Sequence, residues 1–176
     1  MTTNTTTKKT TNRTRKTPVK STSQPKEIKK LPPNPFMNEI LDLLHEQKTD
    51  EDKVKVLKQY ETDSLKSLLI WNYDDTVVSL LPEGEVPYRP NENPLGTDHS
   101  SLRRDYRNLY NFVKGGNDSL SKIRRETIFI QILESLHPLE ADILVLVKDK
   151  NLENKYDITF DIVKEAYPDI QWGNRS

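Results

Sequence analysis

The sequence predicts an all-α single domain of about six to eight helices, with a long Pro-rich internal loop and a disordered basic N-terminal arm. Helix-capping signals recur along residues 34–176, which form the predicted domain. No segment there shows the sustained alternation of apolar and polar residues that is typical of half-buried strands. Residues 1–33 are low in complexity and poor in large apolar side chains, so they cannot offset the entropy of ordering.

The first predicted helices are short and amphipathic. Asn34-Pro35 is a good helix start, and it is followed by an apolar stripe that begins at Phe36. Thr49 and Asp63 are expected to cap the next two helices, and a short helical turn is expected over residues 76–81. After the loop, Ser100 is expected to cap a helix that runs through Lys114. Its inward face is expected to consist of Leu102, Tyr106, Leu109 and Val113.

The densest apolar stretch, residues 119–150, predicts two consecutive buried helices separated by His137-Pro138. Apolar residues occur on most sides of the first helix, so we expect it to be largely enclosed. Pro138 suits the first turn of the second helix, and His137 is expected to cap the corner. The segment 142–148, DILVLVK, is rich in β-branched residues, so a strand is the alternative there. Thr159 is expected to cap a last helix that Pro168 ends.

Residues 82–99 form the one long irregular segment of the domain, with four prolines and two glycines. Loops of this length are uncommon and tend to carry function. Val86, Tyr88 and Leu95 are expected to hold the loop against the domain. Two interpretations stay open: a rigid connector between two helical halves, and a recognition loop that presents Tyr88 and Arg89.

The net charge of zero conceals a strong asymmetry. Residues 1–33 carry nine Lys or Arg and one Glu, which gives +8, so residues 34–176 must carry −8. The arm is expected either to lie on nucleic acid through counterion release or to act only as a solubilising leader. It has no aromatic residue to stack on bases, which weakens the first interpretation.

Within the acidic domain, residues 103–125 are locally basic, with only two acids. Arg103, Arg107 and Lys114 are expected to share one face of the helix that starts at Ser100. The cluster either neutralises acidic helices of the fold or forms a surface for a phosphate or an acidic partner. The candidate partner-binding residues are Arg103, Arg104, Arg107, Lys114, Lys122, Arg124 and Arg125.

The usual catalytic and cofactor motifs are missing. The chain has no cysteine, and its three histidines do not have metal-ligand spacing. No phosphate-binding Gly-rich loop or nucleophile elbow occurs. No apolar run approaches the roughly 20 residues that span a bilayer. We therefore expect no enzyme, no cofactor, no metal and no membrane partner. An enzyme that uses Asp98 and His99 is the minor alternative.

Two long segments carry a resemblance, LLPEGEVPYRPNENPLGTDHSSLRRDYRNLYNFVKGGN and KIRRETIFIQILESLHPLEADILVLVKDKNLENKY. The chain resembles an uncharacterised family of proteins encoded by large tailed bacteriophages, including those of marine cyanobacteria. The resemblance covers roughly Pro35 to Pro168 and omits the arm. It implies a phage protein that acts in the infected bacterial cell, and it transfers no catalytic residue.

We therefore expect a non-enzymatic interaction protein in the host cytoplasm, with a protein or a nucleic acid as its partner. The alternative is a structural or assembly component of the virion, because small helical adaptors with charged arms suit that role.

Overall fold

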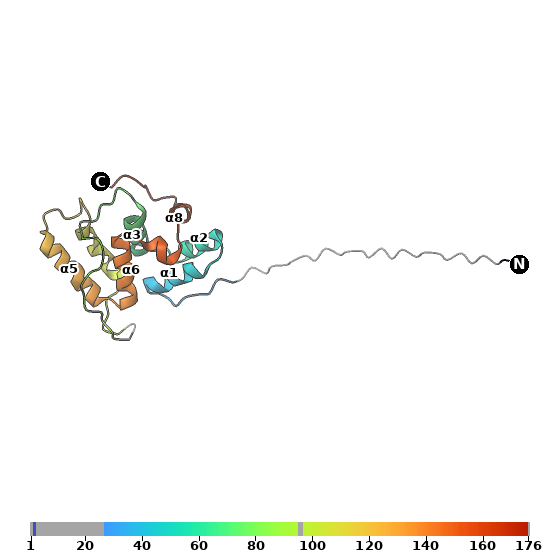
Figure 1. The fold of residues 1–176 in the computed structure, drawn as a ribbon, viewed down its shortest axis with the longest axis horizontal. Helices are drawn as coiled ribbons and strands as arrows, with labels where there is room; N and C mark the ends of the chain where they lie inside the picture. Colours follow the sequence, from blue (N-terminus) through green and yellow to red (C-terminus); the bar gives the residue numbers. More distant parts are fainter. Residues whose placement is uncertain (1, 3–26, 95–96, 176) are drawn as a thin grey trace.

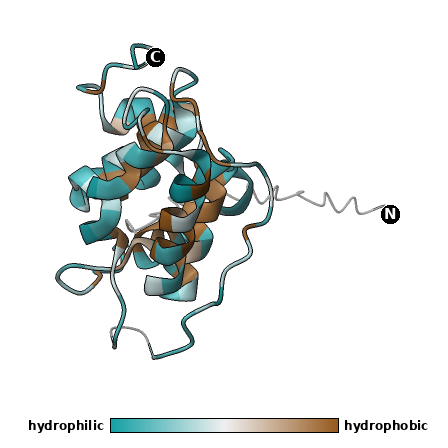
Figure 2. Ribbon diagram, turned by 90° about the vertical axis from the view of Figure 1, so that its left-hand side faces the viewer, coloured by the Kyte–Doolittle hydropathy of each residue, from teal (hydrophilic) through white to brown (hydrophobic). Residues whose placement is uncertain are grey.

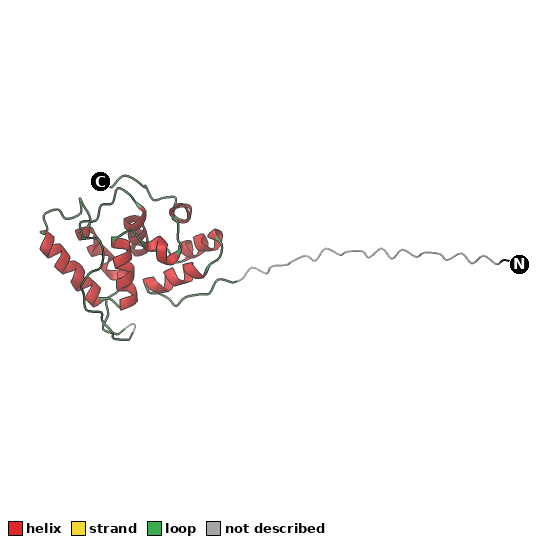
Figure 3. Cartoon of the chain, viewed as in Figure 1, coloured by secondary structure: helices red, strands yellow, loops and turns green. Residues whose placement is uncertain are grey.

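Helices make up all the regular structure in the described residues, which are 2, 27–94 and 97–175 of this computed structural model. They contain no strand, as Figure 3 shows, so the all-α prediction is confirmed, including a helix over the ambiguous segment 142–148. Most of the predicted arm and Leu95 lie outside the described residues. The elements are α1 Met37–Glu46, α2 Asp50–Gln59, α3 Asp63–Tyr73, α4 Leu102–Asp105, the 3-10 helix η1 Tyr106–Phe112, α5 Lys122–Ser135, α6 Pro138–Lys148, α7 Leu152–Tyr156 and α8 Phe160–Ala166.

The helix α6 is the centre of the domain, and it contacts α1, α3, α5 and α7. Figure 1 shows it between α5 and α1, and α2 packs against both α1 and α8. Ala141, Ile143, Leu144 and Val147 of α6 are buried, and Figure 2 shows the apolar residues on the inner sides of the helices. At the start of α6, the Nδ1 atom of His137 accepts a hydrogen bond from the backbone N–H of Leu139 at 3.2 Å, so the predicted corner is confirmed.

The prediction that α5 is largely enclosed is wrong. Only Phe129, Ile132 and Leu133 among its apolar residues are buried, and Ile123 is 79% exposed. The helix packs against α6 and η1, so one side of it stays in solvent despite its apolar residues. Apolar content alone did not indicate this, because it does not say how many neighbours a helix has.

The single helix predicted from Ser100 to Lys114 is also wrong. Its place is taken by α4 and the 3-10 helix η1, and Val113 then pairs with Ser79 in an isolated antiparallel bridge. A 3-10 helix has three residues per turn, so Leu109 and Phe112 lie on one side, and both are buried. The ring of Phe112 stacks on Trp71 at 6.3 Å and meets Phe129 edge-on at 5.1 Å.

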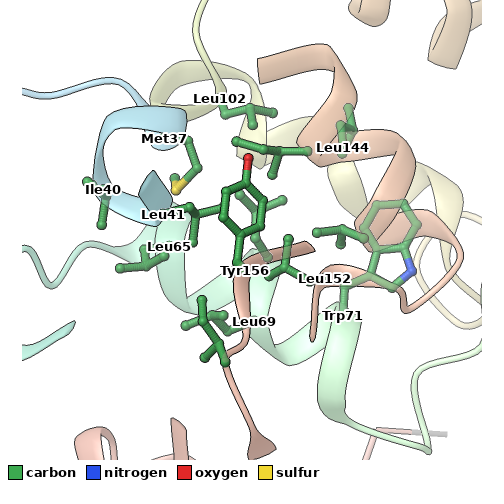
Figure 4. Close-up of a cluster of buried hydrophobic side chains, with 14 of the residues drawn as sticks. Met37, Ile40, Leu41, Leu65, Leu69, Trp71, Leu102, Leu144, Leu152 and Tyr156 are labelled. Atoms are coloured by element: carbon green, nitrogen blue, oxygen red, sulfur yellow. The ribbon is translucent and has the colours of Figure 1, made fainter. Parts of the chain in front are cut away.

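Four smaller predictions differ from the structure. The residue that caps α3 is Thr62 and not Asp63. Asn34 has a positive φ of 59°, so the chain turns there and α1 begins at Met37. Residues 76–81 form no helix, because this segment pairs with residues 112–114. The helix α7 was not predicted, since its short polar sequence hides two buried residues, Leu152 and Tyr156. Figure 4 shows Tyr156 within the central cluster of buried side chains.

The end of the predicted arm lies against the domain. The backbone N–H of Leu31 donates a hydrogen bond to the Tyr60 hydroxyl at 2.8 Å, and Ile28 and Leu31 pack against the core. Contacts with the domain therefore begin before the predicted boundary at Asn34.

One buried carboxylate joins three helices. Glu140 of α6 is fully buried, and its Oε1 accepts from the backbone N–H of Met37 at 2.8 Å. Its Oε2 accepts from the backbone N–H of Leu102 at 3.0 Å. These two residues are the first of α1 and α4, where backbone N–H groups lack partners within the helix. Burial raises the pKa of Glu140, and the two backbone donors oppose that rise.

We expect Glu140→Leu to lower the free energy of unfolding by roughly 2 kcal/mol or more, because two buried N–H groups lose their acceptor. Glu140→Gln keeps one acceptor oxygen and should lose less. Urea denaturation of both variants measures this. Glu165→Gln, at an exposed position of α8, is the control and should stay within about 0.5 kcal/mol of the parent. A Glu140→Leu variant as stable as the parent would contradict this role.

Candidate binding surface

Two of the predicted cations serve the fold. The guanidinium of Arg103 donates to Asn34 Oδ1 at 3.2 Å and to the Pro35 carbonyl at 3.4 Å, so it holds the chain that enters α1. Arg125 is buried, and its guanidinium donates to the backbone carbonyls of Asn111, Asn117 and Leu120 at 2.8, 3.1 and 3.0 Å. Arg125 therefore ties the start of α5 to η1 and does not face a partner.

The other predicted cations are exposed. Lys122 lies 3.9 Å from Glu126, at the limit of an ion pair in solvent. The remaining four form no ion pair with any carboxylate of the described residues. They are Arg104, Arg107, Lys114 and Arg124. Neutralisation by acidic helices, the first interpretation of the cluster, thus lacks support at these four positions.

Exposed apolar side chains are close to these cations in the sequence. Of the four large apolar residues that the described chain exposes, Tyr110 is 53% exposed, Val78 44% and Ile123 79%. Tyr110 lies on η1 between Arg107 and Lys114, and Ile123 lies between Lys122 and Arg124 on α5. We call this set of residues the basic-apolar face: Val78, Arg107, Tyr110, Lys114, Lys122, Ile123 and Arg124.

Backbone contacts hold the parts of the basic-apolar face together. The N–H of Lys114 donates to the Val78 carbonyl at 2.9 Å, which brings residue 78 beside the end of η1. Gly116 packs on the backbone of η1, because a Cβ atom there would lie only 1.9 Å from the Tyr110 carbonyl oxygen. Arg125 then binds the first turn of α5 to the same segment. The face is therefore set by main-chain geometry, and the predicted alignment of Arg103, Arg107 and Lys114 on one helix does not occur.

The predicted recognition loop is docked on α5. The backbone N–H of Arg89 donates to Glu134 Oε1 at 3.0 Å, and an open cavity of about 860 Å³ lies between residues 87–92 and Glu134. Tyr88 is half-buried against the core, as is Val86, which confirms that these two residues hold the loop. Burial and then the nearby Asp142 raise the pKa of the Tyr88 hydroxyl. Arg89 is exposed, so only one of the two candidate residues is fully presented to solvent.

Residues 40–154 match the model of DUF6433, a family of unknown function. The chain belongs to this family. No curated protein and no solved structure matches the chain. The matched range of this DUF6433 chain includes every candidate site residue, together with Glu140. The arm and α8 lie outside it.

The described part of this DUF6433 protein contains no group of three or more His, Cys, Asp or Glu side chains that could hold a metal ion. No helix in residues 27–94 and 97–175 has the length and apolar content needed to cross a membrane. At the site of the minor alternative, Asp98 is exposed and the Nε2 atom of His99 bonds to the Asn93 carbonyl at 2.9 Å.

Sequence reasoning missed the apolar half of the face. The expectation that the first helix of residues 119–150 is enclosed includes Ile123, and Tyr110 is not singled out from the sequence. A signal was present for Ile123, because it lies directly between two cations in the first turn of α5. Tyr110 could have been singled out only if residues 106–112 had been recognised as a helix with three residues per turn in place of 3.6.

The histidine pair of this DUF6433 protein should make its stability depend on pH. The rings of His99 and His137 lie 5.2 Å apart, and burial and then His99 lower the pKa of His137 below its ordinary value of 6.5. The neutral ring is the form that caps α6, so its contribution is complete above about pH 6.5 and is lost as the pH falls through the lowered value.

We expect the free energy of unfolding to fall from about pH 7.5 to about pH 5.5, and to fall less in His137→Asn, which keeps a capping side chain without a titrating ring. Chemical denaturation at the two pH values measures both slopes. Equal slopes in parent and variant would contradict the assignment.

Arg124 and Arg125 are adjacent arginines, one exposed and one buried, so substituting each tests whether it contributes to stability. Arg125→Gln should lower the free energy of unfolding by about 1–3 kcal/mol, because buried carbonyls lose a charged donor. Arg124→Gln should change it by less than about 0.5 kcal/mol, because that side chain is exposed and unpaired among the described residues. Thermal unfolding of the two variants compares them, and equal losses would show that burial of Arg125 has no consequence.

Proposed function

We propose that this DUF6433 chain is a non-enzymatic binding protein that engages an acidic macromolecule through its basic-apolar face. One observation carries the proposal: exposed cations without carboxylate partners in the described chain are sequence neighbours of exposed apolar side chains on η1 and the first turn of α5. A contiguous group of exposed apolar side chains with a charged rim is typical of a surface that a partner covers. The charges direct the encounter, and the apolar groups supply affinity when water leaves.

The resemblance of the two long segments to proteins of large tailed bacteriophages supports a phage origin for the protein. We therefore propose that it acts in the cytoplasm of the infected bacterial cell. The positive charge of the arm would add to the attraction of an acidic partner at low salt. Mass spectrometry of purified particles tests the virion alternative, because a structural component would be present there in many copies.

We expect the double change Arg107→Gln with Lys114→Gln to weaken capture of the partner from infected cells by several-fold and to reduce the dependence of capture on salt. The melting temperature should stay nearly unchanged, because neither side chain forms an ion pair with a described residue. Quantitative mass spectrometry of the captured proteins and nucleic acids measures the effect.

The matched control is Lys58→Gln with Lys155→Gln, which removes two exposed cations from α2 and α7. If the control and the test variant lose the same partners to the same extent, net charge alone governs binding and the proposed face is wrong.

A further inference from the structure

A cavity of about 330 Å³ opens at the edge of the basic-apolar face. It lies between α3, η1 and residue 77, and most of its lining is apolar or aromatic. This size is at the lower end of the range for ligand pockets, and it suits one large side chain. The lining includes Ile70, Trp71, Val77, Tyr106, Tyr110 and Val113.

Trp71 contributes part of its ring to the lining of this cavity. The residue is only 2% exposed, and its indole Nε1 has no acceptor among the described residues. Figure 4 shows that nitrogen on the side of the ring that faces away from the labelled leucines. The nitrogen itself is buried, so an occupant of the cavity meets the apolar part of the ring.

The rim of the cavity is basic. Arg107 and Arg175 both line it. Arg175 is paired with the buried Asp74 at 2.8 Å, whereas Arg107 has no carboxylate partner in the described chain and lies 5.9 Å from the centre of the Tyr106 ring. A cation held at the mouth of an apolar cavity favours an occupant whose apolar group is flanked by negative charge.

We propose that this cavity receives one aromatic or branched aliphatic side chain from an acidic segment of a protein partner. The inference rests on the proposed function and names the class of partner for the same face. An apolar side chain fills such a cavity and loses its contact with water, and buried anchors of this kind dominate the affinity of interfaces. Nucleic acid fits less well, because bases stack on exposed aromatic faces and carry polar edges that an apolar lining leaves unpaired.

The test uses the full chain and an array of acidic peptides in which two central positions vary among all amino acids. We expect peptides with Phe, Leu, Ile or Trp at the centre to bind about tenfold or more tightly than the peptide with Ala, because their side chains leave water. In ¹⁵N-labelled protein these peptides should shift the indole N–H resonance of Trp71. The chain has two tryptophans, so the indole signal that remains in Trp172→Phe belongs to Trp71.

Two variants test the cavity itself. Ser67→Leu places a larger side chain into the lining from α3. Tyr110→Ala removes one wall of the cavity. Because Tyr110 is exposed, this second variant replaces the first if Ser67→Leu folds poorly. Each should remove the preference for apolar centres. Gln131→Leu adds the same apolar group at an exposed position of α5 outside the lining and should leave the preference intact.

The outcomes distinguish failure of the cavity as an anchor site from failure of the proposed function. If acidic peptides bind without regard to the central residue and Arg107→Gln with Lys114→Gln still weakens them, the face stands and the cavity is not an anchor site. If no acidic peptide binds while duplex DNA does, the partner is nucleic acid and the inference is overturned. If neither binds, the cavity inference is overturned and the proposed function loses its support.

Discussion

The domain depends on the burial of one carboxylate, Glu140, at the start of its central helix. A carboxyl group away from water is stable only when hydrogen-bond partners surround it, and here the donors are the first backbone N–H groups of α1 and α4. The same contacts satisfy helix ends that would otherwise be buried without partners. A single side chain thus sets where two other helices begin, at residues far away in the sequence.

The position of the candidate surface follows from this junction. α4 starts at Leu102, whose backbone N–H bonds to Glu140, and continues directly into η1, which carries Arg107 and Tyr110. The tight turns of η1 bury Phe112 between Trp71 and Phe129 and turn Tyr110 to solvent. Core packing on one side and exposure on the other are therefore two results of the same local geometry, and the cavity beside Trp71 lies between them.

The fold class could be predicted because helix caps and apolar spacing are local signals. Thr49, His137 and Thr159 all cap helices as expected. The site was harder to predict, because it depends on contacts between distant segments. Nothing near Arg125 in the sequence shows that backbone carbonyls surround it, whereas its neighbour Arg124 stays in solvent. The pattern from Leu102 to Val113 fits periods of 3.6 and of three, and only packing against Trp71 and Phe129 decides between them.

The link that Arg125 makes has a consequence for how this surface can change over time. Its three acceptors are main-chain oxygens, which every amino acid provides. Substitutions in the connection between η1 and α5 can therefore alter the chemistry shown to a partner while the anchoring bonds persist. The acceptors are also uncharged, so neither added salt nor a change in acidity removes them. If the proposed function holds, a lineage that meets new partners could vary the positions of this stretch other than Gly115 and Gly116 and keep the frame that displays it.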